Sequence, residues 1–474
     1  MATTIGQLAQ ELARTNPWCR DATWHERDPD LSESRSGGVT YRSDVLAGLS
    51  PGSLYILRGP RRVGKTVAVK QEIENLLTSG TPATSVVRVA ADGWDAKDLR
   101  TLLQNTALPL SPTGQPRYWF IDEVSAVVGP WEQQIKWLRD NDNEFRAATV
   151  VLTGSNATAL TAAAGALAGR RGAAGNVDRT LLPIGFRTFV KLVRGNDAPA
   201  ATRLPMDGLH TPLAGDTYRA LLPWLDDLVD LWETYILRGG FPKSVVATVR
   251  GEPIPEGFIE DLFQVVSADA FKTSHLSALT EMALLERLWS SMASPANLSN
   301  IGKDLDITHD TVSRHVAYLR DAFLLWRCPQ RSENHWLPNE RAQDKIYAID
   351  PVMARLAHLR NPQRADIDPT VLTEMQLGTA IRRRALAEKP NAGNDESVFH
   401  VRTPSRKEID FVSESLGSVA IEGKYCEDGT WRSEAATVNA SQWDGILATR
   451  NVLDISDDKA WAVPAGMLAY LLDT

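Results

Sequence analysis

The stretch that decides the fold is Gly59-Pro60-Arg61-Arg62-Val63-Gly64-Lys65-Thr66. It follows an apolar run at residues 54–57 and precedes a long helical pattern that starts at residue 67, so the order is strand, glycine loop, helix. The two glycines allow backbone turns that a side chain would obstruct, and successive N–H groups can then face a phosphate at the positive end of the new helix. In this GxxxxGKT pattern, Lys65 reaches the β- and γ-phosphates and Thr66 offers its hydroxyl to Mg²⁺. The stretch therefore predicts a site for ATP and Mg²⁺.

Length and composition indicate a globular chain of several domains. At 474 residues the chain is too long for one core, and about one domain per 150 residues suggests about three. Hydrophobic residues make up 43% and charged residues 23%, which is typical of folded proteins rather than of disordered or fibrous ones. The net charge of −8 argues against a protein that coats nucleic acid through bulk electrostatics, but a local DNA site stays open.

The cysteines and the distribution of apolar residues predict a cytoplasmic protein. Cys19, Cys328 and Cys426 lie far apart and lack metal-ligand spacing, which fits a reducing compartment better than a disulfide framework. Residues 1–18 have no basic start followed by an apolar block, and the chain has no uncharged apolar run of 18 residues. We expect no membrane partner.

A pair of acids follows the third apolar run of the chain. Residues 85–90 are typical of a second strand and residues 95–104 of a helix, after which residues 117–121 lead directly into Asp122 and Glu123. A buried parallel strand delivers such residues to the carboxyl edge of its sheet, where chemistry takes place. We expect Asp122 to hold Mg²⁺ through water and Glu123 to orient or deprotonate the attacking water. Alternatively, the pair is a strand end with solvated acids.

A fourth buried strand is predicted at residues 148–153, and it ends in small polar residues. Ser155 or Asn156 is placed to sense the γ-phosphate or to fix the attacking water. Alternatively, these residues cap the helix predicted at residues 157–164. Residues 179–186 are expected to add a fifth strand.

The chain contains, in this order, the motifs GPRRVGKT, WFIDE, LTGSN and LAGR, and later GGFP at residues 239–242. The same order is typical of one family of ATPases. The chain resembles the AAA-type ATPases of archaea and bacteria that carry a C-terminal nuclease-like domain, and the resemblance covers nearly its full length. In this family, the residue at Arg170 is a candidate arginine finger. Its alternative is an ordinary surface arginine.

The middle of the chain is predicted to be helical. Trp224, Leu228, Leu231 and Tyr235 lie at helical spacing within residues 218–237, which favours a helical lid with a packed core stripe. Residues 297–319 then have a helix-turn-helix rhythm. Side chains of the second helix can meet DNA, but the surrounding charge is balanced, so we expect weak DNA binding or none. Packing against protein is the alternative.

The last third of the chain contains a D-x(11)-E-x-K pattern, formed by Asp410, Glu422 and Lys424. On a strand pair of this size the two acids can converge on one or two Mg²⁺ ions, while Lys424 shares the face of Glu422 and can position or deprotonate a water. The pattern resembles the PD-(D/E)XK nuclease core, with Glu374 in its auxiliary helix position. A competent nuclease, an inactive nuclease-like fold and a chance match all stay open.

The sequence thus predicts an α/β protein in four regions. An AAA-type P-loop core with a parallel sheet spans residues 1–188, a helical lid 189–280, a winged helix-turn-helix 281–335 and a small α/β nuclease-like domain 336–474. The expected function is ATP hydrolysis coupled to a metal-dependent nuclease that acts on DNA. The alternative is a signalling or scaffold ATPase whose inactive nuclease-like domain binds protein partners. A homo-oligomer is also left open.

Overall fold

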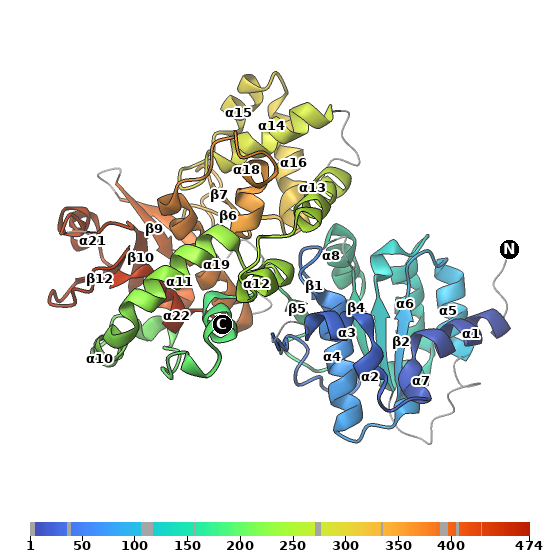
Figure 1. Ribbon diagram of the computed structural model, residues 1–474. Coiled ribbons are helices and arrows are strands. Elements are labelled where there is room, and N and C mark those ends of the chain that lie inside the picture. The colour runs from blue at the N-terminus through green and yellow to red at the C-terminus, as the bar shows by residue number, and fades with distance from the viewer. Residues whose placement is uncertain are drawn as a thin grey trace. The chain divides into compact units, whose positions relative to one another are not determined.

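The computed structural model describes residues 5–35, 39–105, 117–154, 157–270, 276–332, 335–388, 397–403, 407–427 and 429–474. Its ribbon is drawn in Figure 1. The chain divides into two units, Met1–Leu181 and Leu182–Thr474. The second unit contains the whole of the predicted lid and both regions predicted after it.

A five-stranded sheet forms the centre of the first unit (Figure 1). Its strands are β1 (Leu54–Arg58), β2 (Val86–Ala90), β3 (Tyr118–Asp122), β4 (Thr149–Thr153) and β5 (Asp178–Thr180). They lie in the order β2-β3-β4-β1-β5, and every neighbouring pair is parallel. The predicted parallel P-loop sheet is confirmed, and all five strands end at one edge.

Alternate residues of these strands pack on opposite faces of the sheet. Ile56 and Ile121 belong to one hydrophobic cluster, whereas Leu57 and Phe120 belong to another. The first cluster includes residues of α5 (Ala96–Asn105), α6 (Trp131–Asn141), α7 (Asn143–Ala147) and α8 (Ala157–Ala166), and the second includes residues of α4 (Lys65–Thr78). Burial on both faces explains the nearly continuous apolar runs in the sequence.

The first fifty residues close one edge of this sheet. They contain α1 (Ile5–Thr15), α2 (Trp24–Arg27) and α3 (Pro29–Ser34). Asn16 brackets Arg88 of the edge strand β2, since its Oδ1 accepts from Arg88 N at 2.6 Å and its Nδ2 donates to Arg88 O at 2.8 Å. Trp18 Nε1 also donates to Val86 O at 3.0 Å. The segment thus satisfies backbone groups of an edge strand that would otherwise stay open to pairing.

The second unit begins with helices. They are α9 (Phe186–Arg194), α10 (Pro212–Ala220), α11 (Leu225–Arg238), α12 (Pro242–Val249) and α13 (Glu256–Ala270). The sequence predicted an uninterrupted helical pattern over residues 218–237, but α10 ends at Ala220 and a short 3₁₀ turn (Leu222–Trp224) separates it from α11. The reason is Pro223, which cannot donate a backbone hydrogen bond inside a helix.

The glycine pair after α11 has a structural role. Gly239 ends the helix with φ 72°, and Gly240 N donates to Asp350 Oδ2 at 2.7 Å. A Cβ on Gly240 would lie 2.1 Å from Ile184 O. The positive φ accounts for Gly239, and close backbone packing accounts for Gly240.

Three helices follow, α14 (Ala278–Trp289), α15 (Leu298–Asp304) and α16 (His309–Asp321), and α15 and α16 lie where the sequence predicted a helix-turn-helix, which stays a prediction. Thr308 caps α16 by accepting from Thr311 N at 3.2 Å. Two antiparallel strands, β6 (Leu325–Cys328) and β7 (Lys345–Ala348), then form a separate small sheet. The short helices α17 (Pro351–Ala354) and α18 (Leu356–Arg360) come after β7.

The last region is a second five-stranded sheet with helices. Its elements are α19 (Pro369–Glu388), β8 (Phe399–Arg402), β9 (Glu408–Val412), β10 (Val419–Gly423), α20 (Trp431–Glu434), α21 (Ala436–Asn439), β11 (Asp444–Thr449), β12 (Ala460–Pro464) and α22 (Ala465–Leu472). The strand order is β12-β11-β10-β9-β8, with β8, β9 and β10 antiparallel and β10, β11 and β12 parallel. α19, β9 and β10 lie where the sequence predicted a helix and two strands.

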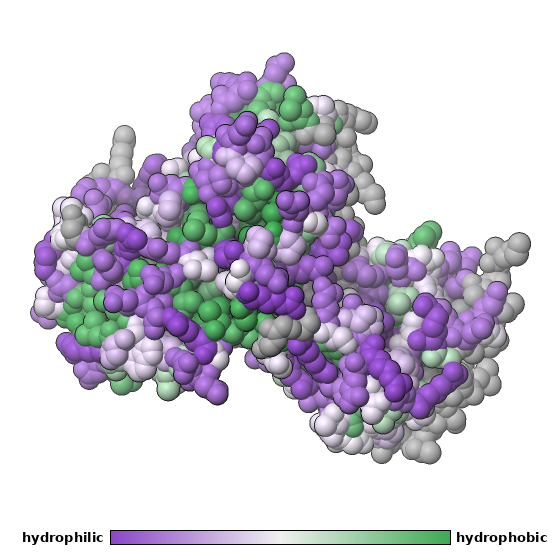
Figure 2. All heavy atoms as spheres, viewed as in Figure 1, coloured by the Kyte–Doolittle hydropathy of each residue, from purple (hydrophilic) through white to green (hydrophobic). Residues whose placement is uncertain are grey.

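The molecular face in Figure 2 carries mainly hydrophilic side chains, and hydrophobic ones form smaller patches between them. Across the part of the chain that the structure describes, we find no helix with the length and apolar character needed to cross a membrane.

Candidate functional site

The glycine loop lies between β1 and α4, where the backbone takes unusual conformations. Gly59 has φ 147° and Gly64 has φ 97°, and both values favour glycine. A Cβ on Gly59 would lie 2.1 Å from Leu181 O, so the backbone approach there also excludes a side chain. Val63 is buried in the cluster beneath the loop, whereas Arg61 and Arg62 are exposed. Hence the loop is anchored by one apolar side chain and shaped by its glycines.

Lys65 is the first residue of α4, and its ammonium group lies inside the curve of the loop. The residue is 6% exposed, and Nζ donates to the carbonyl oxygens of Gly59 and Pro60, both at 2.9 Å. Gly64 caps the helix without a side-chain hydrogen bond, so no side chain of the cap blocks the N–H groups of the first turn. A buried cation beside a helix N-terminus fits a phosphate ligand. Thr66 follows in the same turn and is partly exposed.

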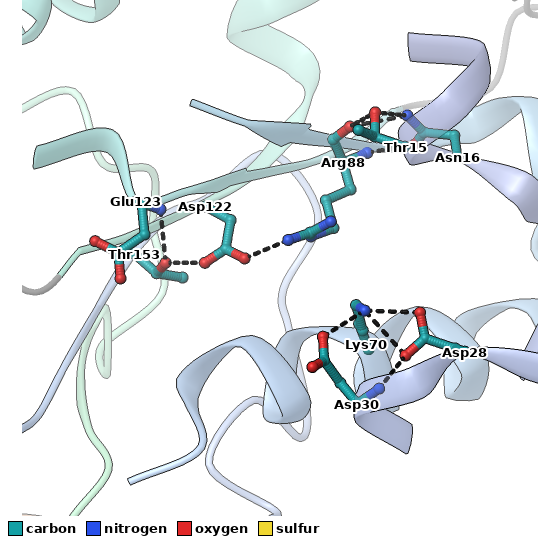
Figure 3. Close-up of polar contacts among 9 residues, drawn as sticks. All are labelled: Thr15, Asn16, Asp28, Asp30, Lys70, Arg88, Asp122, Glu123 and Thr153. Atoms are coloured by element: carbon teal, nitrogen blue, oxygen red, sulfur yellow. Dashed lines mark hydrogen bonds and ion pairs between the residues drawn. The ribbon is translucent and has the colours of Figure 1, made fainter. Parts of the chain in front are cut away.

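Asp122 is the last residue of β3 and is 3% exposed. As Figure 3 shows, its carboxylate lies between two partners. Thr153 Oγ1 donates to Oδ1 at 2.5 Å, and Arg88 Nη2 donates to Oδ2 at 2.7 Å. Both oxygens are thereby oriented, and the guanidinium balances the buried charge. Arg88 comes from the neighbouring strand β2 and was not predicted from the sequence.

Glu123 directly follows β3 and has φ 56°, a left-handed conformation that is uncommon for a residue with a side chain. Its N–H donates to Thr153 Oγ1 at 3.2 Å, so one hydroxyl at the end of β4 connects both acids (Figure 3). Because β1, β3 and β4 are parallel, Glu123 and Asp122 lie at the same sheet edge as the loop after β1. The structure therefore brings Lys65, Thr66, Asp122 and Glu123 to one edge.

Two other predicted residues have a different placement. Ser155 and Asn156 lie outside the described residues. Arg170 lies near the amino end of β1, because Arg139 donates both to Arg170 O at 2.9 Å and to Gly52 O at 2.7 Å. Its Nε forms an ion pair with Asp140 Oδ1 at 2.7 Å. Arg170 thus lies at the amino ends of the strands, whereas the glycine loop of the same chain lies at their carboxyl ends.

The four predicted nuclease residues form a second cluster, in the second unit. β9 and β10 pair with Phe411 opposite Ile421, which places Asp410 opposite Glu422. Gly423 N donates to Asp410 Oδ2 at 3.1 Å, and Lys424 Nζ lies 3.1 Å from Glu422 Oε2. Glu374 on α19 lies beside the same cluster. The helix packs closely on β10 there, because a Cβ on Gly423 would lie only 3.0 Å from Glu374 Cβ.

Lys345, which the sequence did not single out, lies at the centre of this cluster. Its side chain from β7 has no exposed surface. Nζ lies 3.0 Å from Glu374 Oε1, 3.0 Å from Asp410 Oδ1 and 2.5 Å from Glu408 Oε1. Tyr347 OH, also from β7, donates to Glu374 Oε1 at 2.5 Å.

Burial and charge shift the pKa values of these groups in opposite directions. Burial, together with the nearby Asp410 charge, raises the pKa of Glu374 and of Glu422 to about 7. Burial also raises the pKa of Asp410, but the ammonium groups of Lys345 and Lys424 outweigh it and bring that pKa below its usual value. The pKa of Lys345 is raised because three carboxylates outweigh the effect of burial. Asp410 therefore keeps its charge more firmly than Glu374 or Glu422.

The cluster as it stands does not fit a divalent metal ion. Among the residues that the structure describes, no group of three histidine, cysteine, aspartate or glutamate side chains has a metal-binding arrangement. Lys345 contacts one oxygen of Asp410, and Gly423 N contacts the other. An ammonium group in this position repels a second cation. The predicted metal roles of Asp410 and Glu422 stay predictions.

Comparison with protein families identifies two regions of the chain. Residues 52–190 match a family model described as an AAA domain, and residues 229–364 match a domain of unknown function. The search of curated proteins found no match. The first region contains the glycine loop and both acids of the first unit, so these residues lie within the match to the AAA domain.

Several solved structures are similar to the chain. A Walker-type ATPase of Pyrococcus abyssi is 13% identical, with 72% of this chain and 95% of that chain covered and a TM-score of 0.39. The Aeropyrum pernix ORC1 protein in complex with DNA is 14% identical, with 72% and 93% covered and a TM-score of 0.30. The Aeropyrum pernix ORC2 protein is 12% identical, with 67% and 89% covered and a TM-score of 0.33.

Proposed function

We propose that this protein is an AAA-type ATPase that binds ATP with Mg²⁺ and hydrolyses it at the loop of residues 59–66. One observation carries the proposal. The buried ammonium group of Lys65, at a helix N-terminus without a side-chain cap, shares a sheet edge with Asp122 and Glu123. A cation and backbone N–H groups suit the phosphates, and a neighbouring pair of acids suits a metal ion and a water molecule.

Each residue has a separate task in this proposal. Lys65 and the N–H groups of the loop bind the phosphates, and Thr66 and Asp122 would hold Mg²⁺, Asp122 through water. The ion would supply positive charge against the phosphate oxygens. Glu123 orients the attacking water and accepts its proton. Arg88 and Thr153 keep the carboxylate of Asp122 oriented, because each donates to a different oxygen.

Phosphate release from ATP tests the proposal. We expect the wild-type protein to hydrolyse ATP when Mg²⁺ is present and to lose this activity when EDTA is added. Lys65→Ala should abolish productive binding, because it removes the cation that faces the phosphates. A matched control is Arg61→Ala, since Arg61 is an exposed residue of the same loop. Equal hydrolysis by wild type and Lys65→Ala would refute the assignment of the site.

The function of the C-terminal region is a separate question. The convergence of Asp410, Glu422, Lys424 and Glu374 supports a nuclease-like domain that acts on DNA with a metal ion. The buried ammonium of Lys345 among the same carboxylates opposes metal binding. The contacts therefore favour the second function that the sequence left open as far as cleavage is concerned, an ATPase whose nuclease-like domain does not cut, and its binding of protein partners stays a prediction.

A cleavage assay distinguishes the two functions. Purified protein is incubated with single- and double-stranded DNA and with RNA, with and without ATP, in Mg²⁺ or Mn²⁺. We expect no cleavage under any condition. Cleavage that is lost in both Asp410→Ala and Glu422→Ala, with ATP hydrolysis retained, would instead establish the nuclease.

A further inference from the structure

The ammonium group of Lys345 is satisfied by carboxylates from two elements. It has three N–H donors, and Glu374 on α19 together with Glu408 and Asp410 on β9 supply three acceptor oxygens within 3.0 Å. The side chain is completely buried, whereas its partner Glu408 is 23% exposed. A buried lysine is tolerated when its charge is paired and all its protons are bonded.

The neighbouring groups show what the lysine replaces. Glu374 and Asp410 each direct one oxygen at the same Nζ atom, so a single cation bridges the helix and the strand. Glu422 lies opposite Asp410, and its buried Oε1 has no hydrogen-bond partner among the described residues. The carboxylates of Glu374, Glu408 and Asp410 surround the position of Lys345 Nζ, and three carboxylates around one position are a typical oxygen ligand set for a hard divalent ion. In this protein the ammonium group of Lys345 occupies that position.

We propose that Lys345 is the built-in cation of this cluster. Its ammonium group takes the place that a divalent ion would need between Glu374 and Asp410, so the wild-type protein binds no Mg²⁺ or Mn²⁺ there. Removal of the ammonium group leaves the carboxylates of Glu374, Glu408 and Asp410 around the vacated position, where they form a divalent-cation site. Because Lys345 comes from β7, the proposal also makes the small β6–β7 sheet an integral part of the cluster.

Mn²⁺ binding to the full chain without nucleotide tests the proposal. Isothermal titration is carried out on wild type, on Lys345→Met, which keeps an unbranched apolar side chain but removes the ammonium group, and on the double variant Lys345→Met/Asp410→Asn. We expect one additional Mn²⁺ site in Lys345→Met compared with wild type, and its loss in the double variant. Lys424→Met is the matched control, because it removes the other ammonium group and leaves Lys345 in place, so it should gain no site.

Thermal unfolding of the same proteins provides a second measurement. The Lys345→Met variant should unfold at a lower temperature than wild type in EDTA and should regain stability in Mn²⁺, whereas the wild-type transition of this unit should not move. Lys345→Gln, which keeps two N–H donors, is the second variant if Lys345→Met does not fold in EDTA.

Three results would overturn the proposal. The first is wild-type Mn²⁺ binding that is lost in Asp410→Asn, since an ion rather than the lysine would then occupy the cluster. The second is a folded Lys345→Met protein with no more Mn²⁺ sites than wild type. The third is that both Lys345 variants stay unfolded even in saturating Mn²⁺, since the carboxylates would then form no replacement site.

Discussion

At the scale of single residues, buried charged groups differ in how closely a countercharge contacts them. Asp122 receives a hydrogen bond from Arg88, and Lys345 lies among three carboxylates. Glu72, on α4 behind the glycine loop, is 8% exposed and accepts from Asn75 Nδ2 at 3.3 Å. Burial outweighs the hydrogen bond from Asn75 and the nearby charge of Arg42, and it raises the pKa of Glu72 from 4.5 to about 7. Ionisation of Glu72 therefore lowers the free energy of unfolding.

Stability should consequently depend on pH through Glu72. Between pH 4.5 and about 7 the folded state holds a proton that the unfolded state has released, so the free energy of unfolding falls as pH rises through this window. Glu72→Gln removes the ionisation, and we expect it to stabilise the first unit by about 3 kcal/mol at pH 8. Urea unfolding at pH 8 and pH 4.5 measures the difference. The prediction is wrong if the gain at pH 4.5 equals the gain at pH 8.

At the scale of elements, ion pairs attach the N-terminal segment to the helix of the glycine loop. Lys70 of α4 is 9% exposed, and its Nζ lies 2.7 Å from Asp28 Oδ2 and 2.6 Å from Asp30 Oδ2 (Figure 3). Asp28 is also the N-cap of α3, where it accepts from Leu31 N at 3.1 Å. The lysine thus connects α4 to the start of α3.

Removal of this lysine should loosen α3 from α4. Lys70→Met leaves the carboxylate of Asp28, which is 11% exposed, without its cation, and we expect a loss of about 3 kcal/mol in the unfolding free energy of the first unit. Hydrogen exchange should speed up in Pro29–Ser34. Asp30→Asn is the control, since Asp30 is 44% exposed and should matter less. Unchanged exchange in Lys70→Met would contradict this interpretation.

Elements and motifs were predictable from sequence when their residues are consecutive. The strand, loop and helix around Gly59 are encoded within one short stretch, and the acids of β3 follow one apolar run. Arg88 was not predictable because its partner Asp122 is 34 residues away, and only the pairing of β2 with β3 brings them together. Lys345 and Asp410 are 65 residues apart and come from different sheets. The break between α10 and α11 at Pro223 was not predicted, because the helical spacing of apolar residues continues across it.

At the scale of the whole molecule, the position of Arg170 bears on assembly. Its ion pair with Asp140 lies at the sheet edge opposite the loop of its own chain. An arginine finger at this position would have to act on the ATP of a neighbouring copy.

A mixing experiment tests this assembly. If Arg170 is a finger, Arg170→Ala should reduce hydrolysis by roughly 10³ to 10⁵. An equal mixture of Arg170→Ala and Lys65→Ala should recover activity, because one copy supplies the loop and the other supplies the arginine. Asp140→Ala, which keeps Arg170, is the control and should stay active. Wild-type activity of Arg170→Ala would show that Arg170 is an ordinary surface residue.

The central claim is that Lys65 and Glu123 serve one ATP site in different ways, and Glu123→Gln tests it most directly. ATP binding and phosphate release are measured on the same preparation of this variant, in Mg²⁺. We predict wild-type affinity for ATP and a hydrolysis rate lower by about 10² to 10⁴, because Gln cannot accept the proton of the attacking water. Hydrolysis at the wild-type rate would contradict the account.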